Sequence, residues 1–296
     1  MPGSGWRKRQ TACLLLHLAA PDVQSQRRVP TQGSAVRRAG AAMVAAATLV
    51  GPDIAMAHEN TLADAAERYR PLMVEQVDQS SAGARLLRER IAAGDLDGAK
   101  TAWIKARVGW ERAEVFTSGF VPDLDREIDA WPNATLGFHA IEAKLFGAGR
   151  TDAQQETDAL IFHLEDLDVK VKHLELLPQR LLNGIVRLAY EVGESKAGGG
   201  ESAFSGTSLN DMRNNVDGIQ LAYRTIFVAA IAAADPELSA ALHEKIGHLE
   251  KLVDVADLKS LDRDKFRAAS EELIVVLQAA APKIGLRSPT LEEITE

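Results

Sequence analysis

The chain of 296 residues is 46% hydrophobic but only 5% aromatic, and its 42 Asp and Glu outnumber its 34 Lys and Arg. This content supports a substantial core, and the excess of negative charge disfavours nucleic acid and favours cations as partners. With Cys13 as the single cysteine, an intramolecular disulfide framework and a multi-thiolate metal site are both excluded.

Residues 1–57 differ in composition from the rest of the chain. Two arginines at 37–38 precede a small-residue apolar run at 39–50, and Ala55-Met56-Ala57 suits a signal peptidase. We therefore predict a leader and signal peptide over residues 1–57, cleaved after Ala57; the alternative is a disordered N-terminal tail. Cleavage would remove seven basic and two acidic residues and leave 27 basic, 40 acidic and a net charge of −13. No later stretch approaches the ~20 apolar residues of a membrane span, so we expect an exported protein without membrane insertion.

A helical period dominates the remaining chain. Thr61-x-x-Asp64 resembles a capping box and predicts the start of a long helix that runs toward Gly94, with Pro71 at a kink or boundary. A second helix is expected from about residue 96 to 117. Residues 119–132 contain two prolines and several acidic residues, which predicts a loop or a short turn of helix.

A third, short helix carries a His-x-x-Glu motif, and further boundaries follow it. Thr151-x-x-Gln154 predicts a cap for a fourth helix, Pro178 starts a fifth, and a Gly-rich loop at 197–200 ends it. Three more helices are expected near Thr207, at Asp235-Pro236 and near Ser260. About seven or eight helices with short connections predict an all-α fold of antiparallel bundles. The Gly-rich loop predicts a boundary between two bundle halves near 195–206 within a helical domain of residues 58–296; the alternative is a mobile excursion within one domain.

The His-x-x-Glu motif is the strongest chemical signal in the chain. On a helix, His139 and Glu142 lie one turn apart on one face, which resembles half of a metal site. The candidates for further ligands lie within 32 residues, and they are Glu111 and Glu114 on the preceding helix and Asp123, Asp125 and Asp129 in the connecting segment. Carboxylates with one imidazole and no sulfur suit Fe, Mn or Zn.

Ordinary structural roles are also open for each of these residues. His139 and Glu142 could form a surface hydrogen bond, Glu111 could form an exposed ion pair with Arg107, and the aspartates could be turn formers. The other histidines lack the spacing of a ligand pair, although His58 at a new N-terminus could chelate copper. A ferritin-like di-iron centre is disfavoured because it needs two Glu-x-x-His pairs.

An ordered series of motifs resembles the imelysin-like domain of the EfeO/EfeM family. These motifs are residues 69–76, 92–96, 106–114, 123–129, 137–142, 191–196 and 215–218. The resemblance implies two antiparallel four-helix bundles related by duplication, a periplasmic location and a role in iron uptake beside an inner-membrane iron permease and a periplasmic haem peroxidase. It also implies iron or zinc at His139 and Glu142, with Glu111, Glu114 and Asp129 as the remaining ligand candidates.

The chain departs from the family pattern in two places. It is expected to be a short form that lacks the N-terminal cupredoxin domain. In the second half, Gly206 and Ser208 stand where the family has His and Asp, so a secondary metal site is expected to be lost there.

Three functions follow from these patterns. The first is a protein that binds iron and delivers it to a membrane permease. The second is an M75-type metallopeptidase or metallohydrolase, in which Glu111 or Glu114 acts as general base. The third, implied only by the resemblance to one branch of the family, is recognition of an anionic polysaccharide through a bridging cation, since the net negative charge argues against direct binding of a polyanion. Because carboxylates dominate the candidate site and no substrate pocket is signalled, the sequence favours the first.

Overall fold

The structure is a computed structural model that describes residues 52–131, 135–290 and 292–293, with only the backbone described for 52–61. The residues described are largely helical and include no strand, which confirms the predicted all-α class. The main helices, in chain order, are α1 (Pro52–Ala92), α2 (Leu96–Phe120), α3 (Pro122–Ile128), α4 (Gly137–Glu142), α5 (Gln154–Val171), α6 (Pro178–Glu194), α7 (Ser208–Ala222), α8 (Val228–Ala234), α9 (Pro236–Val253) and α10 (Arg263–Ala280).

Short turns of other helix types extend or connect these helices. One π-helical turn, Ala143–Gly147, continues α4, and a second, Tyr223–Phe227, joins α7 to α8. Turns of 3-10 helix follow at Lys196–Gly198, Leu258–Ser260 and Ala281–Ile284. Turns of π-helix are often found beside functional sites, and one of them directly follows Glu142 at the end of α4.

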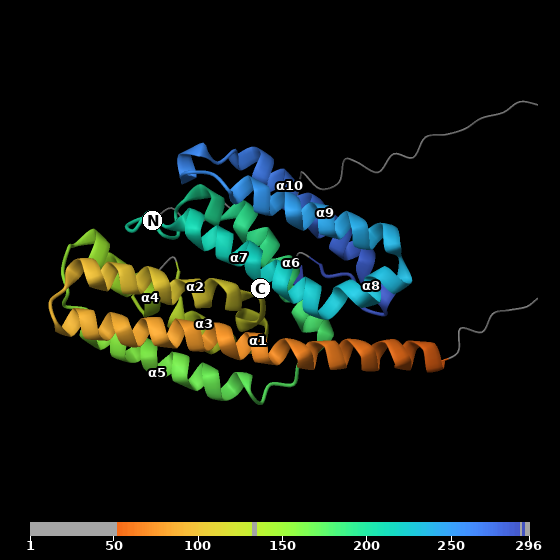
Figure 1. Cartoon of the computed structure of the whole chain (residues 1–296), viewed down its shortest axis with the longest axis horizontal. Coiled ribbons are helices and arrows are strands. Elements are labelled where there is room, and N and C mark those ends of the chain that lie inside the picture. The colour runs from red at the N-terminus through yellow and green to blue at the C-terminus, as the bar shows by residue number, and fades with distance from the viewer. Residues whose placement is uncertain (1–51, 132–134, 291, 294–296) are drawn as a thin grey trace, which may run out of the picture. The chain divides into compact units, whose positions relative to one another are not determined.

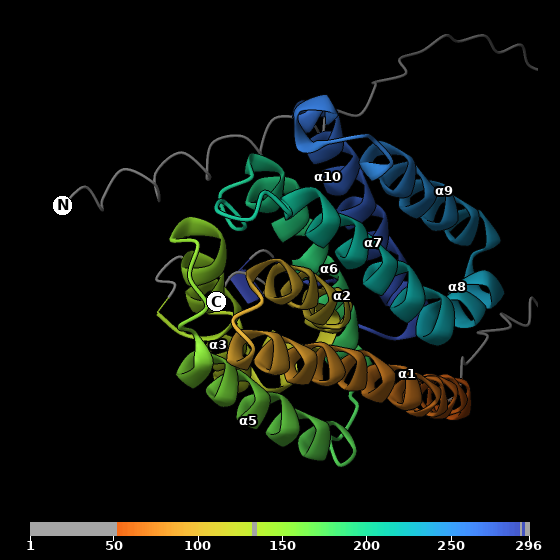
Figure 2. The ribbon, with the colours of Figure 1, turned by 60° about the vertical axis from the view of Figure 1, so that its left-hand side comes forward.

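The helices form two groups that meet at α2. In the first group α1 packs along α2 and α5, and in the second α6, α7, α9 and α10 pack against one another. Helix α2 contacts both α6 and α7, and so joins the groups (Figures 1 and 2). This arrangement agrees with the predicted double bundle.

Close packing of α7 on α2 depends on a glycine. A Cβ atom added to Gly218 would lie 2.6 Å from the carbonyl oxygen of Arg112, closer than such atoms approach in proteins. The absence of a side chain at Gly218 therefore lets the two backbones meet. As a result, polar residues of α7 reach the charged face of α2.

Several predicted helix boundaries are confirmed. Helix α6 begins at Pro178, and α9 begins at Pro236 with Asp235 as its N-cap, whose carboxylate accepts a hydrogen bond of 3.1 Å from the backbone N–H of Leu238. Helix α7 begins at Ser208, next to the predicted Thr207. The starts of α6 and α9 have a proline of fixed φ in the first turn, and α9 also has a capping acceptor, whereas Thr207 makes no side-chain capping bond at the start of α7.

Other boundary predictions are wrong. Thr61 lies inside α1 rather than at its start, and Pro71 also lies inside that helix, so it is not a boundary. Helix α5 has Ala153 as its N-cap and no side-chain capping bond, so Thr151 does not form a capping box. Packing has overridden the local signals at these points, as it often does. For the segment after α2, the second of the two predicted alternatives holds, because it contains the seven-residue helix α3. Residues 1–51 of the predicted leader lie outside the described residues. Only the backbone is described for residues 52–57, so the side chains at the predicted cleavage site lie outside the description as well.

Within the part of the chain that the structure describes, one helical stretch is long and apolar enough to cross a membrane, judged by its length and composition alone. Residues Ser208–Ala234 contain an 18-residue window of mean hydropathy 1.3, half of which is buried inside the protein. A core helix of a soluble protein passes the same test, and the polar Asp211, Asn214 and Asn215 are buried on this stretch. The stretch is therefore weak support for a membrane span.

Candidate metal centre

The charged face of α2 forms one wall of the candidate centre. Arg107, Glu111 and Glu114 are three to four residues apart, so they share one face of the helix. Arg107 donates a hydrogen bond to Glu111, and both side chains have 0% exposure. The ion pair between Arg107 and Glu111 therefore exists, but it is buried and not exposed. The helices α6 and α7 and the segment between them cover this face of α2.

Asp129 enters the centre from the end of α3. It is the C-terminal cap of that helix, and its backbone N–H donates to the carbonyl oxygen of Asp125 at 3.0 Å. Its carboxylate accepts hydrogen bonds from Arg107 Nη1 at 2.8 Å and from Trp110 Nε1 at 2.7 Å. Burial alone would raise the pKa of Asp129, but Arg107 and His139 outweigh burial and hold it well below its usual range. Asp129 is therefore a buried anion.

A glycine at the start of α4 brings His139 to the centre. Gly137 has φ +61°, and an added Cβ would lie 1.9 Å from the carbonyl oxygen of Ile128. Only glycine allows both this backbone conformation and this contact with α3. Trp103 Nε1 also donates to the carbonyl oxygen of Phe138 at 3.0 Å. These two contacts fix α4 against α2 and α3, with His139 facing inward.

His139 lies between two carboxylates. Its Nε2 atom is 3.1 Å from Asp129 Oδ1, an ion-pair distance without the alignment of a hydrogen bond. Its Nδ1 atom is 3.2 Å from Glu142 Oε2. Burial lowers the pKa of His139, but the two carboxylates outweigh burial and raise it to about 9. Nε2 is thus a buried nitrogen without a hydrogen-bond partner among the described residues.

Glu142 is held in place by the segment before α7. Its Oε1 atom accepts hydrogen bonds from the backbone N–H of Ser205 at 2.8 Å and from the Ser205 hydroxyl at 2.7 Å. Burial raises the pKa of Glu142, but its hydrogen bonds from His139 and Ser205 outweigh burial and lower it. Both oxygens of Glu142 are therefore engaged, one with His139 and the other with Ser205.

Lys196 and Glu201 join the centre from the segment that follows α6. The ammonium group of Lys196 is 2.7 Å from Glu111 Oε2, 2.7 Å from Glu114 Oε2 and 3.1 Å from Glu201 Oε1. Glu201 is also 3.6 Å from Arg107 Nη2. Burial raises the pKa of Glu201 to about 7, although Lys196 acts in the opposite direction. Lys196 and Glu201 flank the Gly-rich loop. Their contact with Glu111 could not be predicted from residue spacing, because Lys196 and Glu111 are 85 residues apart in the sequence.

Helix α7 closes the centre with two further polar residues. Asn215 Nδ2 donates to Glu111 Oε2 at 2.9 Å and to Glu114 Oε2 at 2.6 Å. Asp211 Oδ1 lies 3.5 Å from Arg107 Nε, and burial raises the pKa of Asp211 to about 6. Both residues were missed from the sequence because α7 carries many polar residues, and their spacing does not single out the two that face α2.

The structure brings all five predicted ligand candidates together. Two sets of donor atoms lie within 4.8 Å of one another, namely Asp129, His139 and Glu201, and Glu111, Glu114 and Glu201. The first set of one nitrogen and two carboxylates suits Fe, Mn or Zn. Glu142 belongs to neither set and instead contacts the outer nitrogen of His139.

Two of the predicted loop aspartates lie apart from this centre. Asp123 is 92% exposed and pairs with Arg126. Asp125 accepts a hydrogen bond from Thr117, and burial raises the pKa of Asp125. Neither carboxylate is a member of the two donor sets.

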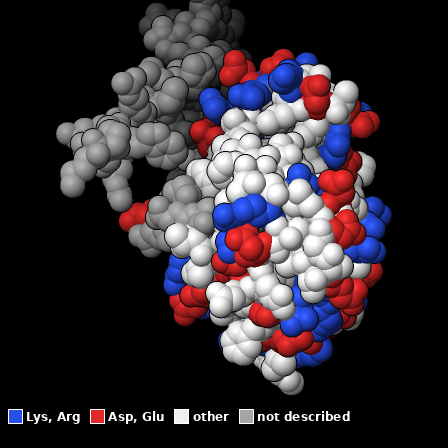
Figure 3. Space-filling view, turned by 90° about the vertical axis from the view of Figure 1, so that its left-hand side faces the viewer, with Lys and Arg blue, Asp and Glu red and all other residues white. Residues whose placement is uncertain are grey.

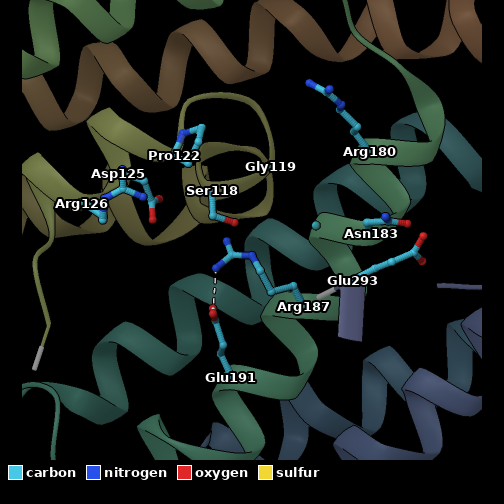
Figure 4. Close-up of a pocket in the computed structure, with 11 residues that line it drawn as sticks. Ser118, Gly119, Pro122, Asp125, Arg126, Arg180, Asn183, Arg187, Glu191 and Glu293 are labelled. Carbon is cyan, nitrogen blue, oxygen red and sulfur yellow. Dashed lines mark hydrogen bonds and ion pairs between the residues drawn. The ribbon is translucent and has the colours of Figure 1, made fainter. Parts of the chain in front are cut away.

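A separate cavity of about 510 Å³ is lined by residues of the C-terminal end of α2, of α3 and of α6, together with Glu293 (Figure 4). Arg187 connects it to the centre, because its Nη2 donates to the backbone oxygen of Glu114 at 2.6 Å while Nη1 donates to Glu191 at 2.8 Å. Arg126 and Arg180 also line this cavity, but the three guanidinium groups point in different directions (Figure 4). They do not form one anion site.

Known proteins with similar sequences carry names connected with iron. Residues 65–136 and 133–283 match the model of the imelysin family, peptidase family M75. The chain is 29% identical over 250 residues to an Efem/EfeO family lipoprotein of Staphylococcus haemolyticus. This alignment covers 80% of this chain and 85% of the lipoprotein. It is 30% identical over 240 residues to the iron uptake system component EfeM of Bacillus subtilis, which covers 79% of this chain. The chain spans 61% of EfeM, less than two thirds of its length.

A solved structure supports the fold. The iron-regulated protein A precursor of Parabacteroides distasonis aligns with a TM-score of 0.60 and 17% identity. The alignment covers 76% of this chain and 95% of that one. At this identity the likeness concerns the arrangement of helices alone.

Proposed function

The chain belongs to the imelysin family (peptidase M75), and we propose that it is an iron-binding component of an iron uptake system, with the ion held by Asp129, His139 and Glu201. The observation that carries the proposal is the buried Nε2 atom of His139, which faces the Asp129 carboxylate without a hydrogen bond. A nitrogen placed in this way is available to a metal once it loses its proton. Iron is the cargo of this centre.

Glu142 has a supporting part in the proposed centre. Metal-binding histidines commonly donate their second ring N–H to a carboxylate, which fixes the ring and strengthens the ligand. Glu142 stands at the Nδ1 atom of His139 and is itself held by Ser205. Glu111 and Glu114, the other two predicted ligands, form the adjoining wall of the centre with Lys196. We assign Asp129 and His139, with Glu201, to direct contact with the ion, Glu142 to positioning His139, and Glu111 and Glu114 to the adjoining wall of the centre.

The geometry favours binding over hydrolysis. In the alternative function, Glu111 or Glu114 would act as a general base toward a metal-bound water. Both carboxylates instead accept hydrogen bonds from Lys196 and Asn215. A carboxylate engaged by an ammonium group and an amide is poorly placed to take a proton from water.

The proposed cellular setting follows from the relatives and the N-terminal sequence. The similar proteins are named as a lipoprotein and as a component of an iron uptake system, which supports export to the cell envelope. We propose a periplasmic protein, cleaved near Ala57, that passes iron to an inner-membrane permease and works beside a haem peroxidase. On the face drawn in Figure 3, basic and acidic side chains are interspersed around an uncharged region. That face lacks the continuous basic surface typical of nucleic-acid binding.

Removal of the imidazole and its partner tests the proposal. In the variant His139→Ala with Glu142→Ala, we expect calorimetry to detect no binding of Fe2+ or Zn2+, while the helical circular dichroism is retained. The control is His163→Ala, on α5, whose ring lies 3.8 Å from Glu127 and outside the centre. Wild-type stoichiometry in the double variant would contradict the assigned site, and metal analysis of the protein from its own periplasm would identify the native ion.

A further inference from the structure

The two donor sets of the centre share one carboxylate. Glu201 belongs both to the set with Asp129 and His139 and to the set with Glu111 and Glu114. Two adjacent sets joined by a shared carboxylate have the layout of a dinuclear site, in which two ions lie about 3.5–4 Å apart. By donor count alone, the centre could take two metal ions.

A side chain of the protein already occupies the second set. The Lys196 ammonium group contacts all three of its carboxylates, at 2.7, 2.7 and 3.1 Å. An ammonium group has three N–H donors, so these contacts match its full capacity. The Lys196 side chain is 3% exposed, and the carboxylates raise its pKa well above the usual value even though burial acts against this. Lys196 is therefore a buried cation.

In the first set, the positive group of the protein does not contact every donor. Arg107 contacts Asp129 but stays 3.6 Å from Glu201, and His139 Nε2 has no hydrogen bond among the described residues. The two sets thus differ in how completely a positive group of the protein engages their donors: Lys196 contacts every carboxylate of the second set, whereas Arg107 contacts the carboxylates of the first set and leaves His139 Nε2 without a hydrogen bond from the described residues.

We propose that Lys196 acts as a built-in cation that fills the set of Glu111, Glu114 and Glu201, so that the centre admits one metal ion, at Asp129, His139 and Glu201. This inference rests on the proposed metal-binding function. Withdrawal of the ammonium group would leave three buried carboxylates side by side with the Arg107 guanidinium, which contacts Glu111 and Glu201 but not Glu114, as their counter-charge, and this disfavours displacement of Lys196. Lys196 therefore determines how many ions the centre holds.

The experiment compares Mn2+ binding by the wild-type chain and by Lys196→Met. The wild type is expected to bind one Mn2+ per chain and to give the six-line electron paramagnetic resonance spectrum of an isolated ion at saturation. Lys196→Met is expected to bind two, with a spectrum broadened by coupling between neighbouring ions. The matched control is Lys144→Met, which removes a partly buried lysine paired with Glu156 at 2.6 Å outside the centre and should still bind one ion.

Each outcome separates this inference from the proposed function. A wild-type chain that binds no Mn2+, Fe2+ or Zn2+ overturns both. One ion in the wild type and one in a folded Lys196→Met overturns the role of Lys196 alone, and so do two coupled ions in the wild type. If Lys196→Met fails to fold, Lys196→Gln replaces it, because the glutamine amide can donate hydrogen bonds to the carboxylates without carrying a charge. The wild-type spectrum tests the number of bound ions in either case.

Discussion

The candidate metal centre and the layer between α9 and α10 are both buried, but they are built from opposite kinds of side chain. The centre encloses Arg107 and Lys196 among carboxylates of α2, α3, α7 and the segment after α6. The α9–α10 layer consists of apolar residues, namely Leu242, Ile246, Leu249, Phe266, Leu273 and Leu277. Apolar burial stabilises a fold directly, whereas buried ion pairs lose much of their attraction to the cost of desolvation. We therefore expect the apolar layer to contribute most to stability and the centre to contribute function.

The largest effect on stability is expected from Phe266→Ala in the apolar layer. The Phe266 side chain is fully buried, so its truncation should lower the free energy of unfolding by about 3–5 kcal/mol. Metal affinity of the folded variant should stay at the wild-type value, because Phe266 lies outside the charged centre. Denaturant unfolding and calorimetry measure the two quantities.

The control for this variant is an exposed phenylalanine. Phe162 on α5 is 66% exposed, so Phe162→Ala should change the free energy of unfolding by no more than about 0.5 kcal/mol. A Phe266→Ala variant that unfolds like Phe162→Ala would break the comparison, since the layer would then not be the stabilising region.

A smaller effect is expected from Glu142→Gln in the centre. The amide keeps the shape of Glu142 but accepts less strongly from His139 Nδ1, so the affinity for Zn2+ or Fe2+ should fall by about 10–100-fold. Unfolding of the metal-free protein should change much less than in Phe266→Ala. Calorimetric titration measures the affinity, with Glu191→Gln, which removes a partner of Arg187 near the separate cavity, as the matched control. An unchanged affinity would place Glu142 outside the metal-binding machinery.

The smallest effect is expected in the change of stability over one pH unit. Burial raises the pKa of Glu201 to about 7 in the folded chain, so the folded state holds more protons than the unfolded state between about pH 4.5 and 7. The free energy of unfolding of the metal-free protein should therefore fall as the pH rises through this window, by up to about 1.4 kcal/mol per pH unit for this group. His139 acts in the same direction between about pH 6.5 and 9, since its carboxylate partners outweigh burial and raise its folded pKa to about 9.

Two variants assign this pH dependence to the centre. Glu201→Gln should flatten the lower part of the stability profile, and Phe266→Ala should shift the whole profile without altering its slope. Unfolding curves recorded between pH 5 and 9 without metal give both slopes. An unchanged slope in Glu201→Gln would show that another group dominates the titration.

Local signals in the sequence were sufficient for the helical framework. The Pro178 start and the Asp235-Pro236 cap act within a single turn, and the structure confirms both. The spacing of His139 and Glu142 likewise placed them on one face of α4, because that relation depends only on helix geometry. Such features need no knowledge of which helices become neighbours.

The tertiary structure decided which charges share a site. Lys196 meets Glu111 across 85 residues of sequence, and Arg107 becomes fully buried only because the second group of helices covers α2. Thr61 and Pro71 show the same limit within α1, where packing along α2 and α5 prevailed over a cap and a helix breaker. Composition, periodicity and short motifs thus determined the helices and the chemistry available to them. The contacts between distant segments decided where that chemistry is assembled, because they arise only when the helices pack together.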